Sequence, residues 1–157
     1  MPRQPTPGQP TLANDAWEAL LTAHAVLMKR FAAEDIWDEV SMREYDVLYT
    51  LSKCPEPLRL SELNRHVLLS QPALSRLVER LAERGLVERH ADPADGRGVR
   101  LSLTAAGRVR QRAVGRRHAR SVARAMSAGL TRAEMEQLET ICRKLACASD
   151  TSEVLVT

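Results

Sequence analysis

The sequence is poor in aromatic residues and in long apolar runs, and it lacks the common motifs of enzymes. Phe, Trp and Tyr make up 3% of the 157 residues, so the core is expected to consist mainly of Leu, Val and Ala. No run approaches the roughly 20 apolar residues of a membrane helix, which predicts a soluble protein with no membrane partner. No phosphate loop, nucleophile elbow or zinc motif is found. We therefore expect no enzyme, no catalytic residues and no cofactor.

Cysteine is also scarce, and its spacing argues against disulfides and metal sites. Cys54, Cys142 and Cys147 form no Cys-x-x-Cys pair, and no signal segment precedes them. The sequence therefore predicts a reduced, cytoplasmic protein. The 4 histidines show no spacing with Cys or Glu that would bring three ligands together locally, so no metal site is expected.

Positive charge is concentrated in one part of the chain. The net charge is only +3, but arginines gather between Arg84 and Arg124. Such a stretch is typical of proteins that bind nucleic acid. The later arginines of this stretch could instead form a solvated face or pair with acids across a dimer.

Apolar spacing and turn residues predict six helices and one hairpin. The proline-rich residues 1–13 predict a disordered tail. An amphipathic helix is expected from Asn14 or Asp15 to about Glu34. Capping boxes at Ser41-Met-Arg-Glu44 and Thr131-Arg-Ala-Glu134 begin two further helices. The other expected elements are a short helix capped by Ser61, a helix 71–84 ended by Gly85, strands 86–90 and 99–104, and a long helix 104–128.

The short helix and the helix 71–84 suit a helix-turn-helix pair. The second helix carries apolar residues on one side and polar residues on the other. Arg can bond to guanine, Ser and Gln to bases or phosphates, and the amides at the start of a helix attract a phosphate. The same polar face could be merely solvated, but the hairpin that follows completes the order of a winged helix and favours DNA binding. The candidate DNA contacts are Ser70, Gln71, Ser75, Arg76, Arg80 and Arg97.

Five segments between about residues 14 and 147 resemble the MarR family of bacterial transcription regulators. They are Ser61-Glu-Leu63, Ser75-Arg-Leu-Val-Glu-Arg-Leu81, Glu83-Arg-Gly-Leu-Val-Glu-Arg89, Asp92-Pro-Ala-Asp-Gly-Arg97 and Leu101-Ser-Leu-Thr-Ala-Ala-Gly107. The resemblance implies a mainly α fold with a small β-hairpin wing, in which a winged helix-turn-helix lobe joins a dimerisation region formed by the terminal helices. It also implies a homodimer that binds double-stranded DNA at a pseudo-palindromic operator.

Within the family the wing arginine enters the minor groove, and the acidic residue two positions before it holds its guanidinium. The resemblance therefore implies these roles for Arg97 and Asp95. The sequence departs from the family at Gly96, where many members carry another arginine, and this removes one potential phosphate contact.

The expected domain organisation has five parts. They are a disordered tail 1–13, a dimerisation helix 14–40, a DNA-binding lobe 41–104, C-terminal dimerisation helices 105–147 and a flexible tail 148–157.

All five aromatic residues lie in the first third of the chain, close to where the resemblance implies an effector pocket. Candidate ligand-binding residues are Trp17, His24, Tyr45 and Tyr49, which suit a small aromatic or phenolic effector that releases a repressor from DNA. Each of the four could instead pack in the core or a dimer interface. Two alternatives stay open: a redox-responsive regulator of the same fold that uses Cys54, Cys142 or Cys147, and a helical interaction protein that has lost DNA binding.

Overall fold

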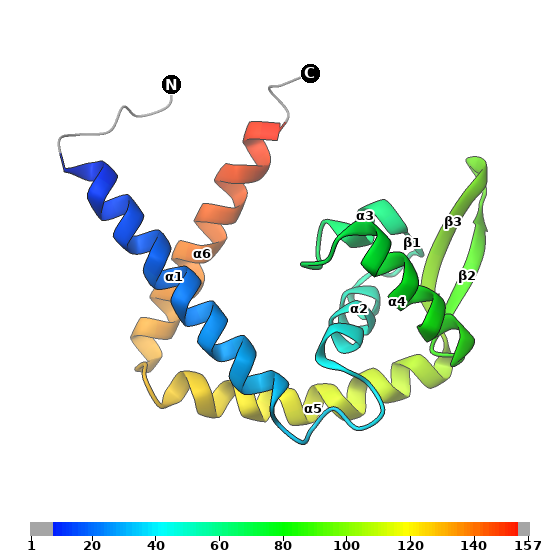
Figure 1. The fold of residues 1–157 in the computed structure, drawn as a ribbon, viewed down its shortest axis with the longest axis horizontal. Helices are drawn as coiled ribbons and strands as arrows, with labels where there is room; N and C mark the ends of the chain where they lie inside the picture. The colour runs from blue at the N-terminus through cyan, green and yellow to red at the C-terminus, as the bar shows by residue number, and fades with distance from the viewer. Residues whose placement is uncertain (1–7, 154–157) are drawn as a thin grey trace. The chain divides into compact units, whose positions relative to one another are not determined.

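The structure is a computed structural model that describes residues 8–153, except for the side chains of Gln9, Gly96, Arg97 and residues 149–153. This described part of the chain contains six helices and three strands. Figure 1 labels them along the ribbon. The mainly α fold with a small wing, which the resemblance implied, is confirmed. No helix among residues 8–153 is long and apolar enough to cross a membrane.

The chain divides into two compact units that meet between His118 and Ala119. The first unit holds most of the elements, and α5 (Ala105–Ser127) crosses the boundary. The second unit holds the end of α5 and α6 (Arg132–Glu153). The elements before α5 are α1 (Gln9–Ala32), α2 (Met42–Lys53), β1 (Leu58–Arg59), α3 (Leu60–Asn64), α4 (Gln71–Glu83), β2 (Val87–Asp92) and β3 (Asp95–Leu103).

The first helix begins earlier than the sequence predicted. Residues 9–13 of the expected tail belong to α1, and residues 1–7 lie outside the described part of the chain. Gly8 is the N-cap residue with φ 85°, and Pro10 lies in the first turn, where its missing amide breaks no intrahelical hydrogen bond. Asn14 and Asp15 are therefore interior residues of α1 and not its caps.

Both predicted capping boxes are confirmed. The amide of Ser41 donates to Glu44 Oε2 at 2.7 Å, and the amide of Glu44 donates to Ser41 Oγ at 3.2 Å. At the start of α6, the amide of Thr131 donates to Glu134 Oε2 at 2.7 Å. Gly85, with φ 68°, follows the last residues of α4 as predicted, because a left-handed conformation there suits glycine.

Two helix ends differ from the prediction. Ser61 is not the cap of α3, because the helix begins at Leu60 and its N-cap residue is Arg59. The Glu62 carboxylate accepts a hydrogen bond from the Arg59 amide at 2.7 Å. In addition, α6 continues to Glu153, so residues 148–153 of the expected flexible tail are helical. These six residues contain no Gly or Pro that would end the helix. Residues 154–157 of that tail lie outside the described part.

The three strands form one antiparallel sheet in the order β1-β3-β2. We name the β2–β3 hairpin the wing. Its strands are longer than predicted, because the ladder includes the pairs Ala91↔Val99 and Asp92↔Asp95 within the supposed loop, with a register shift after Ala91. The sequence did not predict β1, whose two residues are too few to show a period. It pairs with β3 at Leu58↔Leu101.

Aliphatic side chains fill the centre of the first unit, as predicted, and an aromatic cluster adjoins them. Residues with no exposed surface include Val47, Leu48, Leu63, Leu74, Leu81 and Val114. Phe31, Trp37 and Tyr45 are also buried and surround His118 of α5, with ring centroids 5.1 to 5.5 Å from its imidazole. Three of the five aromatic residues therefore lie around His118, where α2, the end of α1 and the segment that follows it pack against α5.

Candidate functional site

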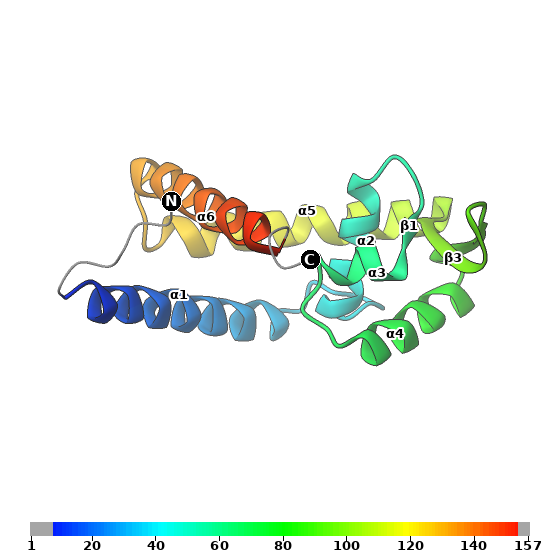
Figure 2. The same ribbon diagram turned by 90° about the horizontal axis from the view of Figure 1, so that it is seen from above.

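The outer face of α4 carries most of the predicted DNA contacts. Four apolar residues of α4, namely Leu74, Leu77, Val78 and Leu81, are buried with at most 4% exposure. Burial of this side turns the opposite side outward, where Gln71, Ser75, Arg76, Glu79 and Arg80 are all exposed. Figure 2 shows α4 beside the wing strands. A polar helix face next to a hairpin is the arrangement that a winged helix uses to approach DNA.

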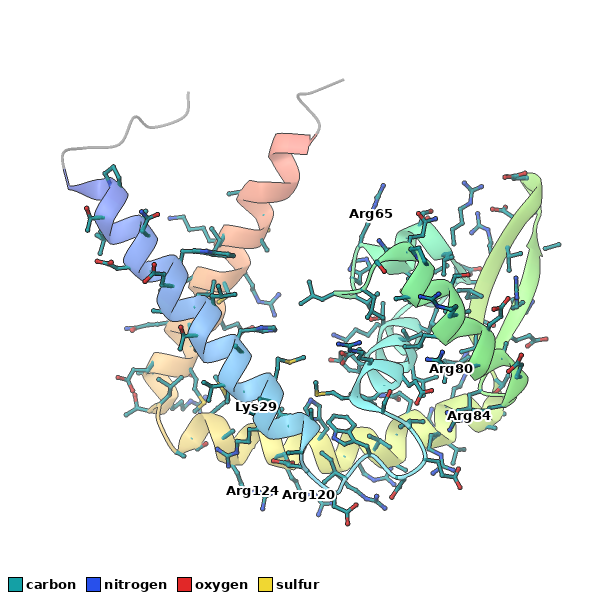
Figure 3. All side chains as sticks on the ribbon, viewed as in Figure 1. Lys29, Arg65, Arg80, Arg84, Arg120 and Arg124 are labelled. Atoms are coloured by element: carbon teal, nitrogen blue, oxygen red, sulfur yellow. The ribbon has the colours of Figure 1, made fainter. Side chains whose placement is uncertain are left out.

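The start of α4 leaves helix amides available for an anion. Ser70 is the N-cap residue and is exposed, as predicted, but its side chain makes no capping hydrogen bond. The amides of the first turn are therefore not satisfied by Ser70 and can bind a phosphate oxygen. Arg65 is exposed just after α3, and Figure 3 shows its side chain projecting away from the lobe.

The other end of α4 is fixed by Arg84. Its guanidinium donates to the backbone oxygen of Glu39 at 2.6 Å and to Glu44 Oε1 at 3.2 Å. Glu44 also belongs to the capping box of α2, so one carboxylate joins the start of α2 to the end of α4. Glu39 in turn accepts from Arg110 of α5 at 2.6 Å. These contacts hold α4 relative to α2 and the first half of α5.

The wing contains an ion-paired group that the sequence did not reveal. Asp92 ends β2 with a fully buried side chain and lies 2.5 Å from Arg59 and 3.2 Å from Arg100. Its partners are 33 and 8 residues away in the sequence, so no local pattern could identify the pairing. Of the predicted wing residues, Asp95 is exposed, and the side chain of Arg97 lies outside the described part of the chain.

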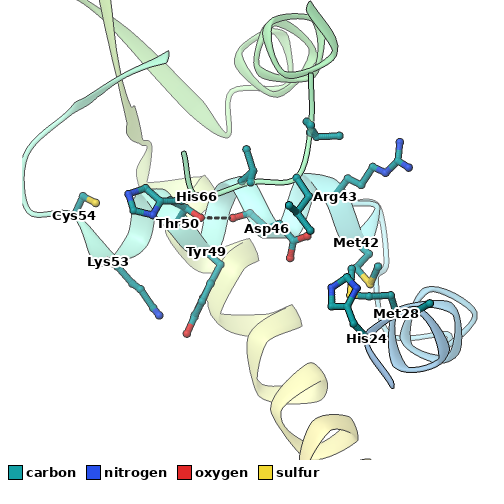
Figure 4. A pocket seen from close by; sticks show the side chains of 14 residues that line it. His24, Met28, Met42, Arg43, Asp46, Tyr49, Thr50, Lys53, Cys54 and His66 are labelled. Carbon is teal, nitrogen blue, oxygen red and sulfur yellow. Dashed lines mark hydrogen bonds between the residues drawn. The ribbon is translucent and has the colours of Figure 1, made fainter. Parts of the chain in front are cut away.

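A cavity of about 770 Å³ lies between α1, α2 and the turn that precedes α4. In Figure 4, His24 and Met28 of α1 lie on one side, Lys53, Cys54 and His66 lie on the other, and Asp46 and Tyr49 lie between them. Residues 66–69 of the turn complete the lining. The volume suits a small organic molecule.

The cavity is lined by an aromatic ring and by charged side chains of both signs. Lys53 Nζ lies 4.2 Å from the centroid of the Tyr49 ring, a cation–π contact. Burial raises the pKa of the Asp46 carboxyl because it disfavours the charged form. Arg43 and Lys53 add positive charge to the lining. The cavity therefore offers an aromatic wall together with groups that can donate and accept hydrogen bonds.

The four predicted ligand-binding residues separate into two groups. His24 and Tyr49 line the cavity, whereas Trp17 and Tyr45 are not among its lining residues. Trp17 is 59% exposed on α1, and Tyr45 is buried against Trp37 and His118. The sequence did not identify Asp46, Arg43 or the turn 66–69 as lining, because they are brought to the cavity by the fold.

His118 occupies a position that no sequence pattern suggested. Burial lowers the pKa of its imidazole, and the nearby charge of Glu34 partly opposes this shift. Burial likewise raises the pKa of the Tyr45 hydroxyl, while a hydrogen bond with Gln111 partly lowers it. Within the described residues, His118 Nδ1 is buried and has no hydrogen-bond partner.

The possible metal ligands and the three cysteines do not form a recognisable site in the described part of the chain. Among the described residues, no three His, Cys, Asp or Glu side chains come together in a way that could hold a metal ion. Cys54 is partly buried and lines the cavity, Cys142 is partly buried on α6, and Cys147 is exposed there. A thiol sensor stays a prediction from the sequence.

Known proteins resemble this chain along most of its length. A family model described as the MarR family matches residues 39–98, from the linker before α2 into the wing. The PcaV transcriptional regulator from Streptomyces coelicolor, solved in complex with its natural ligand, is 30% identical, with 85% of this chain and 91% of that chain covered and a TM-score of 0.63.

Two further Streptomyces coelicolor regulators of the MarR family are similar in structure. Sco3205, solved in complex with DNA, is 27% identical, with 93% of this chain and 90% of that chain covered and a TM-score of 0.72. AbsC shares the fold at 24% identity, with 95% and 99% covered and a TM-score of 0.74. The matched segment, the identity to PcaV and the shared fold together show that this chain belongs to the MarR family of DNA-binding transcription regulators, which are not enzymes.

Proposed function

We propose that this protein is a homodimeric repressor that binds a pseudo-palindromic operator and leaves it when a small molecule occupies the cavity. DNA binding is inferred from the exposed polar face of α4, which carries Gln71, Ser75, Arg76 and Arg80. Helix α4 itself lies beside the wing (Figure 1). The similarity to Sco3205, which was solved with DNA, supports the same use of the fold here. We expect the protein to act in the cytoplasm, where its operator lies.

The dimer is proposed from the exposed apolar side of α1. Trp17, Leu20 and Leu21 fall on one side of this helix and are 59%, 37% and 50% exposed. On α6, Ile141 is 62% exposed. Contiguous exposed apolar residues favour a protein interface. A twofold dimer would present two α4 helices about 34 Å apart, one turn of DNA, and we therefore propose a pseudo-palindromic operator.

The effector is proposed from the position of the cavity. Its lining includes the turn 66–69, which leads directly into α4, so an occupant would contact the segment that positions the recognition helix. PcaV, a relative, was solved with a natural ligand. A ligand shifts the protein away from DNA only if it binds the two arrangements unequally. We favour a small aromatic or phenolic molecule that packs beside Tyr49 and Lys53 and bonds to His24 or Asp46.

The DNA-binding proposal is tested by binding-site selection from random duplexes with the wild type and two arginine variants. Arg76→Ala should relax the selected sequence, because a base contact from α4 specifies the site. Arg97→Ala should mainly lower affinity for sites with A·T-rich flanks. Arg132→Ala removes the same charge from α6 and should behave as the wild type. Failure to select or shift any DNA would favour the interaction protein.

The effector proposal is tested by screening phenolic and aromatic acids for release of the selected duplex. Release should be lost in Tyr49→Ala, which removes the aromatic wall of the cavity, and kept in Arg132→Ala, which lies on α6 outside the lining. A variant with all three cysteines changed to Ser separates the redox alternative. If peroxide releases the wild type but not this variant, a thiol switch replaces the ligand as the regulator.

A further inference from the structure

Asp92 lies at the base of the wing tip, residues 93–98, and it is bonded from three directions. Its Oδ2 accepts from Arg59 Nε at 2.5 Å, and its Oδ1 accepts from the Ala94 amide at 3.0 Å. Arg100 Nε lies 3.2 Å from Oδ1 as an ion pair. The carboxylate has 0% exposure, so these groups take the place of water around it. Buried charge of this kind requires fixed partners.

The three partners come from different sides of the wing tip. Ala94 belongs to the tip itself, Arg100 to the returning strand β3, and Arg59 to β1, outside the hairpin. Arg59 directly precedes α3, and its amide donates to Glu62 Oε2 at 2.7 Å at the start of that helix. Asp92 therefore connects the base of the tip to the first helix of the helix-turn-helix pair.

The tip is also packed closely against Asp92. A Cβ atom placed on Gly98 would lie 2.9 Å from Asp92 Cβ and 3.2 Å from the Asp95 backbone oxygen. Only glycine therefore fits at this position without a shift of the tip. The register shift after Ala91 occurs at the same place, so the ladder alone does not set the path of the tip.

We propose that Asp92 is the positioning residue of the wing: through Arg59 and Arg100 it holds the tip, and hence Arg97, in a fixed orientation relative to α3 and α4. The proposal rests on the proposed minor-groove role of the wing. A fixed wing lets the minor-groove and major-groove contacts form as one binding event, which raises the effective concentration of the second contact.

The experiment is a double-mutant cycle on DNA affinity, with the full chain and the duplex selected by the wild type. Asp92→Asn, Arg97→Ala and the double variant are compared, and Glu88→Gln serves as control, since it removes an exposed carboxylate from the same strand β2. We expect Asp92→Asn and Arg97→Ala each to weaken binding on the order of tenfold. The double variant should bind as Arg97→Ala does, because Asp92 acts only through the tip.

A second readout separates positioning from general structural damage. Asp92→Asn and Arg97→Ala should lose the same discrimination between A·T-rich and G·C-rich flanks, while the sequence selected by α4 stays unchanged. Thermal melting without DNA shows whether each variant is folded. If Asp92→Asn is unfolded, Arg59→Gln takes its place in the cycle, since the Arg59 side chain is 42% exposed and Arg100 still lies beside Asp92.

Two results overturn the proposal, and they differ from each other. In the first result, Arg97→Ala weakens DNA binding, and a folded Asp92→Asn or Arg59→Gln weakens it further by its full separate effect in the double variant. The positioning role of Asp92 is then wrong, while the wing contact of Arg97 stands. If Arg97→Ala binds the duplex as the wild type does, the proposed wing contact is wrong and the role of Asp92 fails with it.

Discussion

Asp92 shows how one buried carboxylate depends on residues that are distant in the sequence. The Ala94 amide and the guanidinium groups of Arg59 and Arg100 hold the pKa of this carboxyl at about 2, below its ordinary value of 3.8. Because the native carboxylate binds a proton more weakly than the unfolded one, its ionisation stabilises the folded state. This stabilisation is complete above the unfolded pKa and is lost as the pH falls toward about 2.

We predict that Asp92→Asn removes this part of the acid dependence of folding. The free energy of unfolding of the wild type should fall more steeply than that of Asp92→Asn between about pH 4 and pH 2, the window between the two pKa values. Urea titrations across this range, with Glu88→Gln as control, measure the difference. Parallel curves for the wild type and Asp92→Asn would contradict the ion-paired state of Asp92.

At the scale of single elements, the sequence predicted local features well and remote ones poorly. The capping boxes at Ser41 and Thr131 and the glycine after α4 involve residues within three positions of one another, so they can be read directly. The polar face of α4 follows from helical spacing alone. The two residues of β1 form a strand only because β3 offers a partner, and the cavity exists only once α1 meets α2.

The position of α5 depends on close packing of Gly107 against Leu86, which the sequence did not predict. A Cβ atom at Gly107 would lie 2.0 Å from the backbone oxygen of Leu86, a distance that no side chain can accept. Gly107 therefore allows the first turn of α5 to lie against the residue that precedes β2. The Thr104 amide donates to the same Leu86 oxygen at 3.2 Å, which fixes the chain as it leaves the wing.

We predict that Gly107→Ala lowers the free energy of unfolding by about 1–3 kcal/mol or more, because backbone must move to relieve the clash. Gly129→Ala is the matched control, since a Cβ there meets nothing within 4 Å. It should be neutral or stabilising by up to about 1 kcal/mol. Urea unfolding midpoints measure both changes. Equal stability of Gly107→Ala and the wild type would show that α5 is not packed as described.

At the scale of the whole molecule, the proposed function depends on two copies of the chain acting together. One lobe can cover one half-site, whereas a dimer covers two and binds them as a single event. Trp17, Leu20 and Leu21 of α1 leave an exposed apolar surface, which we propose that the second copy covers.

We predict that Leu21→Asp converts the dimer to a monomer and weakens DNA binding, because a charge on the apolar side of α1 opposes burial there. Leu21 is 50% exposed, so the fold of the single chain should persist. Thr22→Asp places the same charge on the opposite, exposed side of α1 and should stay dimeric. Analytical ultracentrifugation measures the mass of each variant. A dimeric Leu21→Asp would assign the interface to another surface.

Binding of duplex DNA through α4 and the wing can be tested by measuring the affinity of the protein for a selected duplex as salt is raised. Lys and Arg contacts to several phosphates release counterions, so affinity should fall by a hundredfold or more between about 50 and 200 mM salt. Arg97→Ala should show a shallower salt dependence than the wild type. Binding that does not change with salt, or no binding to any duplex, would show that α4 and the wing do not bind DNA as proposed.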